Sequence, residues 1–278
     1  YGTYSKWITL SEEDCQKRLR LEFLGVFQKA RVYLNGEKVG EHRGGYTPFL
    51  VELTNVAHPG KNHLIVSVDN LWDARLAPRA GEHQFNGGIY RDVQLIVTEF
   101  CGIEEYGVFV QTTKLERENE ELNVWNATVK IETQVFEQRS RIEEPLFLET
   151  CICDGETVLA KEISRSNMKT EGKNDSEKKD GNSTSSMNSK TITQQISLSG
   201  IQPWSPNSPK LYTVVSRVSY NGILVDCVRT NFGIRTVRFD KDNGFFLNGE
   251  HFAILGANVH QDHAGWGDAV TRAGIQRD

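Results

Sequence analysis

The sequence contains no long apolar run and no basic stripe, and these two absences exclude the simplest membrane and nucleic-acid functions. No stretch approaches the roughly 20 apolar residues that a transmembrane helix needs, so we expect no membrane partner. The 32 Lys and Arg residues are scattered and are outnumbered by 37 Asp and Glu residues, which gives a formal net charge of -5. Because binding to phosphate backbones depends on clustered Lys and Arg, we expect no nucleic-acid partner either.

Cysteine is too scarce and too irregularly placed to indicate a disulfide framework or a zinc site. The chain has five cysteines, an odd number, and only Cys151 and Cys153 are close together. No second cluster of Cys or His completes a zinc pattern, so we predict five free thiols. The N-terminus also lacks the charged region and apolar run of a signal peptide. It starts within a predicted strand, so we expect the native N-terminus to lie upstream.

The length of 278 residues suits two ordinary domains and a remnant, and residues 1–100 read as the first domain. Short apolar stretches, punctuated by proline, predict strands at residues 21–26, 30–34, 63–68 and 92–97. Asn35-Gly36 is a strong signal for a two-residue hairpin turn. With no helical periodicity between the strands, this pattern predicts a β-sandwich.

Residues 101–240 form a second predicted β region, of the immunoglobulin-like kind. Residues 124–135 alternate in polarity, residues 211–218 and 224–228 continue the pattern, and Asn221-Gly222 predicts another hairpin. A polar insert at residues 164–190 is rich in Ser, Asn, Lys, Gly and Glu. Such a composition buries too little apolar surface to offset its ordering entropy, so we predict a disordered excursion between two strands.

The sequence pattern of residues 241–278 differs from that of the two β regions before it. A hairpin leads to an apolar strand at residues 252–256 that we expect to be buried, then to a loop with two histidines and an aspartate, and residues 268–278 could begin a helix. This order is typical of the first strand, loop and helix of an α/β barrel. His260, Asp262 and His263 could also form a metal cluster. We reject that interpretation because the run lacks the helical i, i+4 spacing that aims ligands together.

Four stretches of the sequence together form a recognisable pattern. They are Val32-Tyr33-Leu34-Asn35-Gly36-Glu37-Lys38-Val39-Gly40; Asn86-Gly87-Gly88-Ile89-Tyr90-Arg91-Asp92-Val93; Leu211-Tyr212-Thr213 with Phe232-Gly233-Ile234-Arg235; and Phe246-Leu247-Asn248-Gly249 before Gly256-Ala257-Asn258-Val259-His260. In this order the chain resembles glycoside hydrolase family 2. The family contains β-galactosidases, β-glucuronidases and β-mannosidases. The resemblance implies a jelly-roll β-sandwich, then an immunoglobulin-like β-sandwich, then the first strand and loop of a truncated TIM barrel.

The resemblance also implies roles for two residues. In the family, the histidine that closes the first barrel strand reaches the sugar, and His260 stands at that position; the alternative is a rim histidine held by packing. An imidazole can donate to a sugar hydroxyl as the transition state forms. Glu82 lies six positions before Gly88, where galactosidases usually carry an aspartate. Glu82 is therefore a candidate substrate contact, or else an exposed loop charge.

Other polar residues of these motifs are expected to be structural. We expect Arg91 to be held by a carboxylate or carbonyl partner, and Asp92 and the Asp69-Asn70 pair to be structural loop groups. Arg235 is a candidate for bracing the second domain against the barrel. None of these expectations requires contact with substrate.

The resemblance places the decisive chemistry beyond Asp278. Retaining glycosidases need an acid/base and a nucleophilic carboxylate roughly 5 Å apart, and in this family both are glutamates on later barrel strands. We therefore expect a retaining exo-β-glycosidase as the full-length parent, most similar to a β-galactosidase, and an inactive piece on its own. The alternative is a non-catalytic carbohydrate-binding or scaffold protein of two β-sandwiches.

The partners follow from the same resemblance, whereas the sequence leaves the compartment unknown. The resemblance implies a carbohydrate as partner. It admits a cation (Mg or Na) and a homo-oligomeric assembly in the full-length protein. It also favours a periplasmic or secreted bacterial location over a cytoplasmic one.

Overall fold

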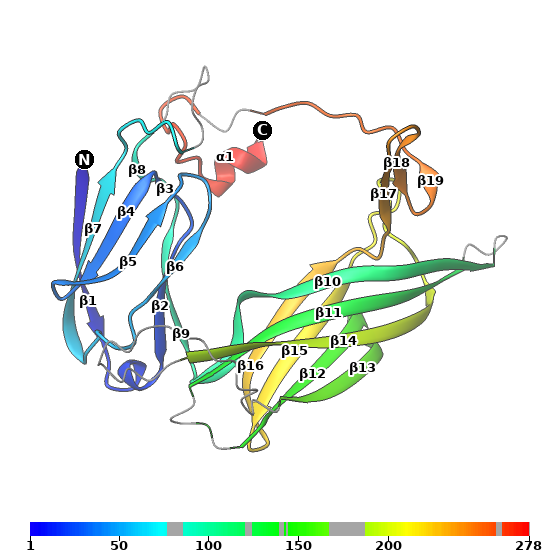
Figure 1. Ribbon diagram of the computed structural model, residues 1–278, viewed down its shortest axis with the longest axis horizontal. Coiled ribbons are helices and arrows are strands. Elements are labelled where there is room, and N and C mark those ends of the chain that lie inside the picture. Colours follow the sequence, from blue (N-terminus) through cyan, green and yellow to red (C-terminus); the bar gives the residue numbers. More distant parts are fainter. Residues whose placement is uncertain are drawn as a thin grey trace. The chain divides into compact units, whose positions relative to one another are not determined.

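A computed structural model describes residues 1–76, 86–119, 124–138, 142, 144–166, 187–259 and 263–277. The chain divides into two compact units: unit 1 contains Tyr1–Thr98 with Ala257–Asp278, and unit 2 contains Glu99–Gly256. Both are built almost entirely of antiparallel strands (Figure 1), in agreement with the predicted fold class. Among the described residues, no helix is long and apolar enough to cross a membrane.

Unit 1 is a β-sandwich. One sheet has the strand order β1-β7-β4-β5, the other has β6-β2-β9, and β3 pairs with β8. The elements are β1 (Gly2–Leu10), a 3-10 turn (Asp14–Gln16), β2 (Arg18–Phe23), β3 (Val26–Phe27), β4 (Lys29–Leu34), β5 (Glu37–Arg43), β6 (Phe49–Glu52), β7 (Gly60–Asp69), β8 (Gly88–Ile89), β9 (Val93–Thr98) and α1 (Arg272–Arg277).

The core of unit 1 forms because apolar residues alternate along its strands. Leu19, Leu21 and Phe23 of β2 are buried in one cluster with Val32 of β4 and Val66 of β7. The predicted strand at residues 21–26 is interrupted after Phe23 and resumes at Val26 as β3. Gly25, in the connection, leaves room for the Tyr90 ring, because an added Cβ atom would lie 2.8 Å from Cζ of Tyr90. The first sandwich therefore brings Tyr90 against the β2–β3 connection.

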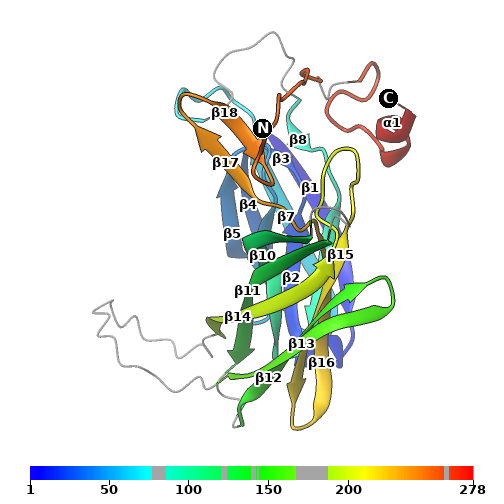
Figure 2. The same cartoon turned by 90° about the vertical axis from the view of Figure 1, so that its right-hand side faces the viewer.

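Unit 2 is a second sandwich, of a three-stranded sheet β10-β11-β14 and a four-stranded sheet β13-β12-β15-β16 (Figure 2). A small sheet β17-β18-β19 follows. The strands are β10 (Cys101–Asn119), β11 (Val124–Gln138), β12 (Leu146–Asp154), β13 (Thr157–Ser166), β14 (Met187–Ile201), β15 (Tyr212–Tyr220), β16 (Ile223–Phe232), β17 (Val237–Asp240), β18 (Gly244–Leu247) and β19 (Glu250–His251). The inner faces of the two large sheets share one core, with Val129, Ile131 and Ile196 against Ile152 and Val214.

Asn-Gly pairs make the hairpin turns of both units. Asn35 and Gly36 between β4 and β5 have φ of 52° and 88°, and Asn221 and Gly222 between β15 and β16 have φ of 50° and 76°. Positive φ at both central residues is what a type I′ turn requires, and Asn and Gly tolerate it best. Both predicted hairpins are thus confirmed.

The polar insert is shorter than the predicted residues 164–190. The β13 strand runs to Ser166 and β14 begins at Met187, so both ends of the predicted insert are strand. Polar residues join these strands because their backbones pair, Ser166 with Leu146 and Lys190 with Val135. Residues 167–186 lie outside the described residues.

The prediction of a buried strand at residues 252–256 is wrong. The last strand ends at His251, and Ile254 and Leu255 are 64% and 93% exposed. The Phe252 amide still donates to the Phe245 carbonyl oxygen of β18 at 2.9 Å. Beyond it, among the described residues, no strand pairs with residues 253–256, so they gain no ladder hydrogen bonds from an extended conformation. A helix does follow, but it begins at Arg272 rather than Asp268. Thr271 caps it by accepting from the Gly274 amide at 3.2 Å.

Candidate functional site

Two segments that are far apart in the sequence meet in unit 1. The Arg91 guanidinium donates to the backbone carbonyl oxygen of Asp268, 177 residues later. A Cβ atom on Gly267 would clash with the side-chain amide of Asn86. The motif at residues 86–93 therefore packs against the segment that follows the histidine-rich loop.

Tyr90 supports Arg91 in this position. The guanidinium lies 5.0 Å from the centre of the Tyr90 ring and 3.4 Å from its carbonyl oxygen. The Tyr90 hydroxyl donates to the Gly45 carbonyl oxygen at 2.5 Å. Burial raises the pKa of Tyr90, Arg91 lowers it, and the charge of Asp268 raises it. Arg91 thus has the carbonyl partner that the sequence predicted, whereas the Asp92 side chain is exposed.

A tight turn between His263 and Gly267 forms the other side of the contact. The Gly267 amide donates to the His263 carbonyl oxygen at 2.8 Å, and the His263 amide donates back to the Gly267 carbonyl oxygen at 3.1 Å. Gly265 and Gly267 have φ of 86° and 54°, which L side chains rarely adopt. Trp266 stacks on His263, with ring centroids 5.3 Å apart and planes inclined by 28°.

Asp268 places a carboxylate beside this turn. It is 9% exposed, and its Oδ2 atom has no hydrogen-bond partner within the described part of the chain. Burial raises the pKa of Tyr46, and the charges of Asp268 and Tyr90 add to that effect. The Tyr46 ring lies 6.3 Å from the Tyr90 ring. Together, the two phenols, Arg91 and the Asp268 carboxylate make a polar cluster with aromatic walls.

The predicted substrate contacts lie outside the described residues. His260 and Asp262 belong to residues 260–262, and Glu82 belongs to residues 77–85. Of the three residues weighed as a metal cluster, only His263 is described. Across the described ranges, no group of three or more His, Cys, Asp or Glu side chains is placed to hold a metal ion.

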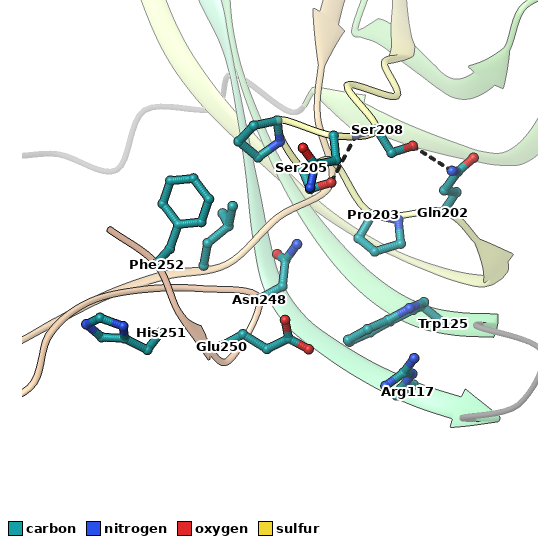
Figure 3. A pocket seen from close by; sticks show the side chains of 13 residues that line it. Arg117, Trp125, Gln202, Pro203, Ser205, Ser208, Asn248, Glu250, His251 and Phe252 are labelled. Carbon is teal, nitrogen blue, oxygen red and sulfur yellow. Dashed lines mark hydrogen bonds between the residues drawn. The ribbon is translucent and has the colours of Figure 1, made fainter. Parts of the chain in front are cut away.

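Unit 2 has a separate hollow of about 260 Å³, shown in Figure 3. Trp125 forms one wall with Arg117, whose guanidinium lies 5.4 Å from the ring centre. Asn248 fixes the opposite wall, because its Oδ1 atom accepts from the Thr236 amide and its Nδ2 atom donates to the Trp204 carbonyl oxygen, both at 3.0 Å.

A second, larger hollow of about 840 Å³ lies over Trp204 and Arg235, which stack with 4.5 Å between the guanidinium and the ring centre. The role of Arg235 in bracing a barrel stays a prediction. Neither hollow of unit 2 includes residues of the motif at 86–93 or of the histidine-rich loop, so the unit 1 cluster is the stronger candidate.

Glycosidic hydrolysis uses two carboxylates. Among the described residues, Asp268 supplies the carboxylate whose charge raises the pKa of both phenols of this cluster. The sequence interpretation missed Tyr46, Trp266 and Asp268. A weak signal existed for Trp266, because a large aromatic between two glycines (Gly265 and Gly267) is typical of a ring held out on a tight turn.

Two family models match this chain. The family model of the sugar binding domain of glycosyl hydrolases family 2 matches residues 1–99, and a second model of glycosyl hydrolases family 2 matches residues 127–235. These two ranges cover most of the residues of both units.

Curated relatives carry two different activities in their names. A β-glucuronidase of Bacteroides fragilis is 31% identical over 273 residues, which is 97% of this chain and 36% of the relative. A β-galactosidase of Thermoanaerobacter pseudethanolicus is 30% identical over 262 residues, which is 93% of this chain and 31% of the relative. The chain thus spans about a third of the length of these relatives.

A solved structure shows the same fold. Bacteroides uniformis β-glucuronidase 2, covalently bound to cyclophellitol-6-carboxylate aziridine, superposes with a TM-score of 0.83 at 27% identity. The match covers 99% of this chain and 31% of that one.

Proposed function

Because this chain belongs to glycoside hydrolase family 2, we propose that it is the N-terminal part of a retaining exo-β-glycosidase that hydrolyses terminal β-linked sugars. The observation that carries the proposal is the contact between Arg91 and Asp268. It joins the motif of the sugar-binding domain to the segment directly after the predicted sugar-contacting histidine. A sandwich domain that only binds or scaffolds would not require this connection.

In this proposal the chain supplies binding groups, and the cleaving groups come from outside it. His260 donates to a sugar hydroxyl, and Glu82 approaches the substrate from unit 1. The acid/base and nucleophilic glutamates lie beyond Asp278, so we expect residues 1–278 alone to be inactive. The covalent ligand of the B. uniformis enzyme supports a nucleophilic mechanism, because a retaining glycosidase forms a covalent bond to the sugar ring.

For the sugar, we propose galactose, on the run His260-Gln261-Asp262-His263-Ala264-Gly265. Glucuronate is the second candidate, because the relative that is 31% identical is a β-glucuronidase. The two sugars differ at C4, where the hydroxyl is axial in galactose and equatorial in glucuronate, and at C6, where glucuronate carries a carboxylate. A cation in the whole protein also stays a prediction, and no step of the mechanism is derived through it.

The test begins with the coding sequence downstream of Asp278. The proposal requires an Asn-Glu pair at the end of one barrel strand and a second glutamate further on. The full-length protein is then assayed on aryl β-galactoside and aryl β-glucuronide, with residues 1–278 alone as the inactive control. Absence of the two glutamates would refute the enzyme and leave the carbohydrate-binding or scaffold protein.

The role of His260 is tested in the same assay. We expect His260→Ala to lower kcat/KM by about a hundredfold, within the range that single transition-state contacts supply. His251→Ala is the matched control, because His251 is exposed on the short strand β19. Equal activity of the two variants would contradict the role of His260.

A further inference from the structure

We propose that Trp266 is a sugar-stacking residue of the substrate site and that Arg91 is the residue that positions it. The inference rests on the proposed glycosidase function and deepens it by naming a contact for the apolar face of a sugar ring. It is carried by the described residues of unit 1.

The first step is the way in which the chain presents Trp266. The indole sits on the turn closed by the two hydrogen bonds between His263 and Gly267. Its amide donates to the His263 carbonyl oxygen at 3.0 Å, and its carbonyl oxygen accepts from the Ala269 amide at 3.1 Å. A backbone fixed on both sides of a residue leaves little freedom to lose when a ligand binds.

The second step is the exposure of the ring. Trp266 is 45% exposed although it stacks on His263. Its six-membered ring also rests near Gly274, where an added Cβ atom would lie 3.0 Å from Cζ3. Because His263 and Gly274 hold the indole ring while part of it stays exposed, the ring is preorganised to contact a ligand.

The third step is the anchor. Arg91 donates to the carbonyl oxygen of Asp268, two residues after Trp266, and Gly267 lies against the Asn86 side chain. Both partners belong to the motif at residues 86–93. The position of Trp266 is therefore set by the sugar-binding domain rather than by its own loop alone.

The chemistry favours a sugar over other ligands. A pyranose presents a face of C–H groups and a rim of hydroxyls, and an indole offers a broad apolar face with one N–H donor. The polar cluster that includes Asp268, two residues after Trp266, also holds the Tyr46 and Tyr90 phenols, and carboxylates and phenols are groups that suit hydroxyls. Trp266 also lies six positions after His260, the predicted sugar contact.

Trp7 offers the contrasting case. It stacks on His63 with centroids 4.4 Å apart and is 61% exposed. It stands on β1, whose backbone pairs along its whole length with β7. Single exposed apolar residues of this kind are common on protein surfaces, which makes Trp7 the matched control.

The experiment uses the full-length protein and an aryl β-glycoside that it hydrolyses. We expect Trp266→Ala to raise KM about tenfold with kcat within twofold, which is the signature of lost uniform binding. Trp266→Phe, which retains a ring, should recover most of the loss, and Trp7→Ala should match the wild type. An unchanged KM in Trp266→Ala, or an equal change in Trp7→Ala, would overturn the proposal.

The positioning role of Arg91 has its own readout. Arg91→Ala should raise KM as Trp266→Ala does. The double variant should have the same KM as Trp266→Ala alone, because both changes remove the same contact between Trp266 and the sugar. Arg91→Lys, which preserves the charge and a donor, should lie between. Additive increases in KM would show that Arg91 does not act through Trp266.

The failure of the stacking proposal can be distinguished from the failure of the proposed function. If the wild-type protein hydrolyses no β-glycoside, the proposed function fails. If it does and Trp266→Ala behaves as wild type, only the stacking proposal fails.

Discussion

Arg91 and Asp268 connect the two stretches of sequence that make up unit 1, because the Arg91 guanidinium donates to the Asp268 carbonyl oxygen. The contact lies within unit 1, which is made of two stretches of sequence separated by the whole of unit 2. The region after the histidine-rich loop is thus held by the sandwich domain. This relationship leads to the first of four predictions.

Arg91→Ala should loosen the turn at residues 263–268 without unfolding the sandwich. The lost hydrogen bond leaves a carbonyl oxygen without its charged donor, at a cost of about 1 to 3 kcal/mol. Amide exchange measured by NMR should speed up at Gly267 and Ala269 and stay unchanged in β7. The control is Arg31→Ala, an exposed arginine on β4. Equal protection of Gly267 in both variants would contradict the anchor.

Asn248→Ala should destabilise unit 2 more than the same change at Asn221. Both residues occupy hairpin turns with positive φ, of 52° and 50°, so both variants bear the same backbone strain. Within the described residues, only Asn248 of the two has side-chain hydrogen bonds. Its Oδ1 atom accepts from the Thr236 amide, and its Nδ2 atom donates to the Trp204 carbonyl oxygen. We expect a difference of about 2 kcal/mol in the free energy of unfolding, measured by urea denaturation. An equal loss of unfolding free energy in the two variants would mean that the backbone strain of the turn, and not the side-chain hydrogen bonds, causes the destabilisation.

Glu149 should contribute to stability at neutral pH and lose its contribution in acid. Hydrogen bonds from Lys161 and then from Arg217 hold the pKa of its carboxyl below the usual range. Because the pKa is lower in the folded than in the unfolded chain, the contribution is complete above about pH 4.3, the ordinary glutamate pKa. It disappears as the pH falls through the lowered value.

The measurement for Glu149 is thermal unfolding between pH 7 and pH 3. The gap in Tm between wild type and Glu149→Gln should be widest at pH 7 and should close in acid. Glu156→Gln, a change at an exposed turn residue, is the control and should leave a small gap that does not vary. A gap that widens in acid would reverse the predicted sign.

Thiol labelling should separate Cys227 from Cys101. All five cysteines are free, as the sequence predicted, and Cys227 is exposed. Burial raises the pKa of the Cys101 thiol to about 12, and the charges of Glu137, Glu99 and Asp226 add to it. The thiolate is the reactive form, so iodoacetamide at pH 8 should label Cys227 first in the folded chain, as followed by mass spectrometry. Early labelling of Cys101 would mean that its strand opens.

The sequence was sufficient for features that depend on neighbouring residues. Alternation over residues 124–135 predicted the two faces of β11, where Ala127, Val129 and Ile131 are buried, because the faces of a strand repeat every two residues. The Asn35-Gly36 and Asn221-Gly222 turns followed from the φ angles that those two residue types tolerate. Family resemblance added the order of the domains.

Features that depend on distant residues could not be predicted in this way. The buried strand expected at residues 252–256 was wrong because burial depends on a neighbouring strand, not on apolar residues alone. Tyr46 and Asp268 gave no local signal, since their significance comes from a contact between β-sandwich and tail. Arg91 was expected to have a carboxylate or carbonyl partner, but nothing in the sequence indicated that this partner is the Asp268 carbonyl.

The divided sequence of unit 1 has a consequence for biosynthesis. A ribosome adds roughly 5 to 20 residues per second, so Asp268 is made about 9 to 35 s after Arg91, given the 177 residues between them. During that interval the sandwich strands are complete, while the Arg91 guanidinium and the Tyr46 ring await their partner. The nascent first domain therefore passes through a stage in which Arg91 lacks the Asp268 carbonyl acceptor, and the contact between the two stretches of unit 1 forms only after unit 2 has been synthesised.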